Sequence, residues 1–164
     1  METEKTRDEL FKTLIGKSTL KQDIYANTFA ALRLFKSVIE ELTKDYLVKF
    51  ESMKTHRNIA FENRYRGDFE IELKFGGDIL LFLMHTNVFE FNRDHDIMRS
   101  PYIREDRERS YRGIINIYNF LSDSFKYNRY NDIGYLIGRI FINKENHYFI
   151  EGKREIGLLF NNFA

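Results

Sequence analysis

Apolar and charged residues alternate strictly over residues 69–75, the clearest pattern in the chain. A period of two with one charged face is typical of a strand that is solvated on one side. Gly76 and Gly77 follow and predict a tight hairpin turn. The next segment, residues 79–84, is apolar at every position, as expected for a central strand that is covered on both faces. We therefore expect an antiparallel hairpin at the centre of the fold.

The apolar run ends abruptly at His85, Thr86 and Asn87. His85 and Asn87 have the same parity as Ile79, Leu81 and Leu83, so the pattern predicts that their side chains point to an interior face. Buried polar groups need hydrogen-bond partners. Two interpretations remain open: the strand bends or bulges at His85 and its side chains bond nearby backbone, or His85 and Asn87 line a pocket at the end of the sheet.

Two segments that precede the hairpin have helical spacing. Residues 4–16 carry apolar side chains on one side and end in a glycine, which predicts a short amphipathic helix. From residue 20 to about residue 53, apolar residues recur every three or four positions and predict one long helix. Such a helix is longer than a small sheet can cover. Either it is bent or broken and packs within the monomer, or residues 20–53 form a homodimer through their near-heptad seam.

Residues 92–112 show no clear periodicity and contain the single proline, Pro101. A connection of this length is uncommon inside a compact domain, and an ordered one is often a lid or a binding loop. Its arginines and acidic residues could order it through mutual salt bridges. Residues 104–109 could form a charged helical turn.

The C-terminal part of the chain predicts further strands. Residues 113–125 fit either a strand or a helix, whereas residues 134–142 and 147–150 flank a polar turn and predict a hairpin. Residues 154–163 have helical spacing. We therefore predict a single α+β domain over residues 1–164.

In this architecture, residues 1–55 form two N-terminal helices, the second of them long. Residues 56–164 form an antiparallel sheet of about five strands, with the inserted loop 92–112 and a C-terminal helix.

Composition narrows the classes of function. The chain of 164 residues has no cysteine, which excludes disulfides, thiol catalysis and thiolate metal sites. Its net charge of +1 argues against a general electrostatic attraction to nucleic acid or to acidic membranes. The polar N-terminus and the absence of a long apolar run predict a cytoplasmic protein that does not cross a membrane.

The inserted loop could close over the end of the central strand and complete a binding site. Arginine and tyrosine side chains from the loop would then join the polar groups of the strand around a small anionic or planar molecule. The candidate ligand-binding residues are His85, Asn87, Tyr102, Arg104, Tyr111 and Arg112.

Two other kinds of chemistry have weaker signals. His85 and the sequence Asp94-His95-Asp96 could converge on a metal ion, although the chain has no His-x-x-x-His spacing. The interleaved arginine and tyrosine residues of 102–112, continued in residues 126–130, could stack on single-stranded nucleic acid, but acidic residues interrupt them.

No glycine-rich nucleotide loop and no local nucleophile motif is present in the sequence, and no pattern indicates a cofactor. We therefore expect a non-enzymatic domain that binds a small molecule or a protein partner and self-associates through its long helix. The alternative is a metal-assisted hydrolase that uses His85, Asp94, His95 and Asp96. Binding of single-stranded nucleic acid comes third.

Overall fold

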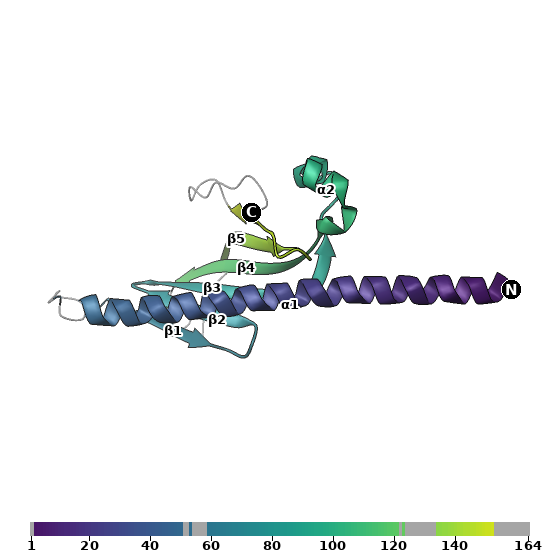
Figure 1. Ribbon diagram of the computed structural model, residues 1–164. Coiled ribbons are helices and arrows are strands. Elements are labelled where there is room, and N and C mark those ends of the chain that lie inside the picture. Colours follow the sequence, from purple (N-terminus) through teal and green to yellow (C-terminus); the bar gives the residue numbers. More distant parts are fainter. Residues whose placement is uncertain (1, 51–52, 54–58, 122, 124–133, 153–164) are drawn as a thin grey trace.

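The computed structural model describes residues 2–50, 53, 59–121, 123 and 134–152. Its architecture is α+β: one long N-terminal helix packs against a six-stranded antiparallel sheet (Figure 1). The strands follow one another in chain order, and each pairs antiparallel with the next. The elements are α1 (Glu2–Phe50), β1 (Phe61–Tyr65), β2 (Glu70–Phe75), β3 (Asp78–Glu90), η1 (Asp96–Arg99), α2 (Pro101–Glu105), η2 (Arg107–Ser110), β4 (Tyr111–Leu121), β5 (Tyr135–Ile142) and β6 (Tyr148–Gly152).

Helix α1 is continuous, so the prediction of two N-terminal helices is wrong. The helix passes through Gly16 without a break. A glycine inside a helix costs only about 1 kcal/mol relative to alanine. The neighbouring residues Leu14, Ile15 and Lys17 are not prolines, which would break the helix. Within the described residues, no helix has an apolar stretch long enough to cross a membrane.

One face of the sheet packs on the C-terminal part of α1. Ile24, Leu32 and Ile39 are buried there at helical spacing. Leu32 and Ile39 join a core of apolar residues from β2 to β5. Part of the seam predicted within residues 20–53 therefore packs on the sheet of its own chain, whereas Leu42, Phe50 and Met53 of that seam are exposed. The helix overhangs the sheet at its N-terminal end (Figure 1).

The hairpin of β2 and β3 confirms the central prediction from the sequence. The strands pair antiparallel, with Leu73 opposite Leu80, and the turn contains Gly76 at a φ of 57°. A positive φ of this kind is costly for residues with a Cβ atom. On β3 it is the even-numbered residues, such as Phe82 and Met84, that face α1.

Within the part of the chain that the structure describes, the sheet has six strands, one more than the number expected. The undecided segment 113–125 is strand through residue 121, as part of β4, and the hairpin predicted around residues 143–146 is present as β5 and β6. The predicted helix at residues 154–163 lies outside the described residues, as does the Tyr/Arg stretch 126–130.

The segment between β3 and β4 is an ordered insertion of short helices. Ser100 caps α2 by accepting a hydrogen bond from the Ile103 backbone N–H, and Pro101 occupies the first turn. Ile97 and Ile103 are buried in a second apolar cluster with Phe91 and Phe141. This cluster lies on the sheet face opposite α1, and Figure 1 shows the insertion on that side of the molecule.

Candidate ligand-binding site

The alternation of side chains along β4 creates a partly polar surface on the sheet face opposite α1. Gly113 and Ile115 point toward α1, so Arg112, Asn116 and Tyr118 point to the other side. The register of β5 and β6 places Arg139 and Glu151 opposite each other on that same side. Together with residues of the insertion they line a depression of about 390 Å³. Its lining consists of Phe91, Asn92, His95, Arg112, Ile114, Asn116, Tyr118, Arg139, Phe141 and Glu151.

Arg112 is the unusual residue of this pocket. Its guanidinium lies 3.6 Å from the centre of the Phe91 ring and 4.9 Å from that of Phe141. Its Nε and Nη1 atoms are buried and have no hydrogen-bond partner in the described part of the chain. Burial lowers the pKa of Arg112 to about 10, and the nearby Glu151 carboxylate opposes this effect only in part. Two of the three nitrogen atoms of this cation therefore have unused hydrogen-bonding capacity within the described structure.

A second polar group, formed by His95 and Glu151, closes one side of the pocket. His95 Nδ1 accepts the backbone N–H of Ile97 at 3.2 Å, so a neutral ring carries its proton on Nε2. That nitrogen donates to Glu151 Oε1 at 2.7 Å. Glu151 Oε2 lies 3.8 Å from Arg139 Nη1. The Glu151 carboxylate is thus oriented by His95 and balanced in charge by Arg139.

The remaining charge in the pocket is positive, because no carboxylate forms an ion pair with Arg112 among the described residues. A carboxylate or phosphate matches the planar guanidinium fork and would supply the missing acceptors. The half-buried side chains of Ile114 and Tyr118 provide apolar surface for the rest of such a molecule, while Phe91 and Phe141 are buried. The geometry suits a small anion with a flat apolar body.

The structure does not bring the four metal candidates together. No group of three or more metal-ligating side chains occurs within the described ranges. Both ring nitrogens of His95 are engaged, and Asp96 is exposed and lies 3.5 Å from Arg99. Asp94 is exposed as well. This arrangement lends no support to the metal-assisted hydrolase.

His85 and Asn87 lie at a bulge of β3, and their side chains are exposed rather than interior. His85 Nδ1 accepts the backbone N–H of Asn87 at 3.1 Å, and its ring packs edge-on against Phe89. The first interpretation from the sequence, a bulge whose histidine bonds nearby backbone, describes this geometry. Neither residue lines the pocket around Arg112.

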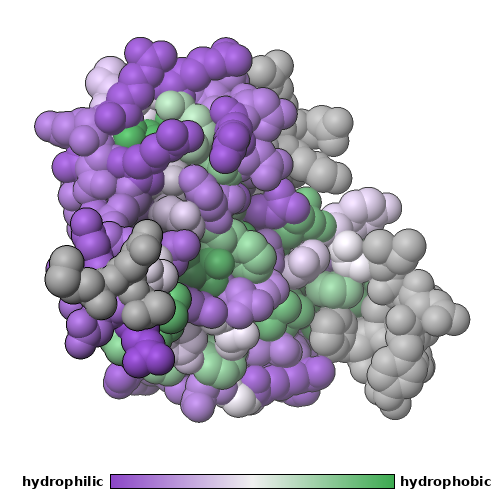
Figure 2. All heavy atoms as spheres, turned by 90° about the vertical axis from the view of Figure 1, so that its right-hand side faces the viewer, coloured by the Kyte–Doolittle hydropathy of each residue, from purple (hydrophilic) through white to green (hydrophobic). Residues whose placement is uncertain are grey.

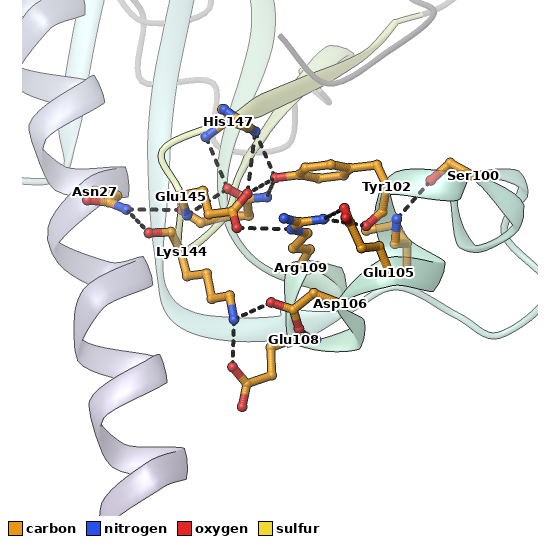
Figure 3. Close-up of polar contacts among 12 residues, drawn as sticks. Asn27, Ser100, Tyr102, Glu105, Asp106, Glu108, Arg109, Lys144, Glu145 and His147 are labelled. Carbon is orange, nitrogen blue, oxygen red and sulfur yellow. Dashed lines mark hydrogen bonds and ion pairs between the residues drawn. The ribbon is translucent and has the colours of Figure 1, made fainter.

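Tyr102 and Arg109 hold the insertion onto the turn between β5 and β6 (Figure 3). The Tyr102 hydroxyl donates to Glu145 Oε2 at 2.6 Å and accepts from Asn143 Nδ2 at 2.8 Å. Arg109 Nε donates to Glu145 Oε1 at 3.0 Å, and Arg109 Nη1 donates to Glu105 Oε2. Burial and the Glu145 hydrogen bond raise the pKa of Tyr102 to about 12.

Lys144 continues this network by pairing with both Asp106 and Glu108 at 2.7 Å. The salt bridges expected to order the loop are therefore present, but most of them run to the β5–β6 turn. Tyr102 serves the packing of the insertion, Arg104 is exposed, and Tyr111 is half-buried at the start of β4. Of the six candidate ligand residues, only Arg112 lines the pocket.

Sequence reasoning missed Asn116, Tyr118, Arg139 and Glu151. A signal for the first two was present, because assignment of residues 113–121 as strand puts Asn116 and Tyr118 on one face with Arg112. The other two required the register across the β5–β6 turn.

No family model, curated protein or solved structure matches the chain, so its residues and their geometry are the basis for assigning a function.

Proposed function

We propose that this chain is a non-enzymatic binding domain for a small anionic molecule, which it holds in the pocket between the insertion and the sheet. Arg112 is the principal contact for the anionic group of the ligand. Asn92 and Asn116 offer further polar contacts, and Ile114 and Tyr118 pack against the apolar part.

The observation that carries this proposal is the state of the Arg112 guanidinium. A buried N–H group without a partner costs roughly 1–3 kcal/mol, and natural folds rarely keep one. Among the described residues Arg112 has two such nitrogens; both are screened from solvent, but the half-buried side chain as a whole lines the depression. A bound carboxylate or phosphate would remove this cost by accepting hydrogen bonds from the cation once the guanidinium turns toward the depression.

The size of the pocket supports a small molecule over a protein or a nucleic acid. A volume of about 390 Å³ lies at the lower end of the range for small-molecule sites, which runs from about 300 to 1,000 Å³. Single-stranded nucleic acid would need accessible cations and aromatic rings in series. Arg109 and Tyr102 are already bound to each other and to Glu145, which weighs against that third function.

The proposal can be tested by calorimetric titration with benzoate and phenyl phosphate, which join an anionic group to a flat ring. Benzamide has the same ring without a charge and serves as the ligand control. The variants are Arg112→Met and, as a matched control, Arg104→Met, since Arg104 is an exposed arginine outside the pocket.

We expect at least one of the two anions to bind the wild type more tightly than benzamide. The change Arg112→Met should weaken this binding about 10- to 100-fold, because a charge-assisted hydrogen bond contributes roughly 1.5–3 kcal/mol. Arg104→Met should leave it unchanged. Equal anion binding by the wild type and Arg112→Met, or none by the wild type at millimolar concentration, would refute the proposal.

A further inference from the structure

The N-terminal third of α1 has no contact with the sheet that buries its side chains. Every residue from 4 to 19 is exposed, and the first buried residue of the helix is Ile24. At 1.5 Å per residue this overhang is about 24 Å long. Figure 1 shows it extending well beyond the sheet toward the N-terminus.

The overhang carries an apolar stripe that nothing in the described structure covers. Leu10, Phe11, Leu14 and Ile15 are 62%, 55%, 59% and 66% exposed. Their spacing of one, three and four residues places them on one side of the helix. Figure 2 looks along α1 from this end, and hydrophobic residues appear in the middle of the face while the insertion above is mostly hydrophilic.

A projecting helix with such a stripe is stabilised in proteins by packing, because isolated helical segments of this length are marginal in water. We propose that the overhang, residues 4–21, pairs antiparallel with the overhang of a second copy of this chain. This pairing is independent of the proposed ligand site. It also differs from the predicted dimer through residues 20–53, whose seam is partly covered by the sheet.

The distribution of charge selects a second copy in this orientation. Residues 2–9 contain four acidic and two basic residues, whereas residues 10–21 contain three lysines and no acidic residue. Antiparallel pairing centred between Lys12 and Thr13 lays the acidic part of each helix beside the basic part of the other. The helix dipoles then also oppose each other favourably. Parallel pairing would lay the acidic parts of the two helices beside each other, and the basic parts likewise.

The same alignment matches the apolar residues. With residues 12 and 13 at the centre, Phe11 lies level with Leu14 of the second copy, and Leu10 lies level with Ile15. Each contact occurs twice because the pair is symmetric. The two sheets then lie at opposite ends of the helix pair, so they do not compete for space.

Sedimentation velocity over a range of concentrations tests whether this dimer exists. We expect wild-type protein to move from monomer to dimer as its concentration rises into the micromolar range. The double change Leu10→Ser with Leu14→Ser should raise the dimer dissociation constant more than tenfold, because each lost contact counts twice. Leu34→Ser is the control, since Leu34 is 66% exposed on the same helix but lies over the sheet region and outside the overhang.

Because the chain has no cysteine, single cysteines can carry spin labels that report the orientation. Labels at Thr13→Cys should lie close together in an antiparallel or a parallel pair. Labels at Lys5→Cys should be offset by about 22 Å along the axis only if the pair is antiparallel. Three results would overturn the proposal. They are a wild type that stays monomeric, Lys5→Cys labels that lie as close together as in a parallel pair, and an effect of Leu34→Ser equal to that of the double change.

Discussion

Replacing Arg112 with methionine removes a buried cation, and we expect the variant to be more stable than the wild type. Among the described residues of the wild type, the Nε and Nη1 atoms of Arg112 lack acceptors, at a cost of roughly 1 kcal/mol each at the low end of the range for unsatisfied groups. Methionine has a similar length and no hydrogen-bond donor. Its sulfur can also contact the rings of Phe91 and Phe141.

The change also removes a favourable interaction. The guanidinium stacks on Phe91 at 3.6 Å, and a partly desolvated cation–π contact contributes roughly 1 kcal/mol. A sulfur–aromatic contact recovers about half of that. Together these terms predict that Arg112→Met raises the free energy of unfolding by about 1.5 kcal/mol.

Urea unfolding followed by circular dichroism measures this difference in free energy, provided that the unfolding free energy of both proteins falls with urea concentration at the same slope. The matched variant is Arg109→Met, which removes an arginine of the insertion whose Nε and Nη1 atoms donate to Glu145, Glu105 and the Tyr102 carbonyl. We expect Arg109→Met to lower the unfolding midpoint. If Arg112→Met lowered it as well, Arg112 would be a structural residue and the reasoning from its unused donors would be refuted.

Three further changes test the packing and the polar network. Gly113→Ala would place a Cβ atom 1.9 Å from Thr28 Oγ1, so we expect it to cost about 3 kcal/mol in urea unfolding and Thr28→Ala to recover part of that loss. Asn143→Ala removes a buried side chain that accepts two backbone N–H groups, so it should cost about 2 kcal/mol and increase proteolysis of the insertion. The Tyr102 hydroxyl lowers the pKa of Glu145 below its usual 4.5, so the folded state binds fewer protons and its stability should fall as the pH drops through this range. A Tyr102→Phe variant should lose less stability between about pH 6 and pH 3 in the same urea assay, and an equal loss would contradict the assignment.

The sequence was informative where one local rule decides the structure. Strict alternation in residues 69–75 and the glycine pair after it placed β2, the turn and β3 correctly. The strand of residues 113–121 was ambiguous, because β-branched residues at 114, 115 and 117 fit either period in so short a segment. The break expected at Gly16 is absent because a single glycine is too weak a signal to end a helix.

The site was harder to predict because its residues meet through tertiary structure. Arg112 was predicted to line the site together with His85 and Asn87. The bulge in β3 leaves His85 and Asn87 exposed, and neither lines the pocket around Arg112. A bulge shifts the alternation of a strand without a mark in its composition. Arg139 and Glu151 come from a different hairpin, whose position next to β4 follows only from the order of the strands.

The proposed function depends on ligand binding in the pocket around Arg112, and the side-chain Nε–H signal of this residue reports on that binding. Nitrogen-edited NMR spectra of protein labelled in arginine, assigned with Arg112→Met, would be recorded during titration with benzoate. We predict that the Arg112 signal moves to lower field and exchanges more slowly with water, since a carboxylate accepts its free donor. A titration in which the Arg112 signal stays fixed, or in which only exposed arginines such as Arg104 respond, would contradict the account.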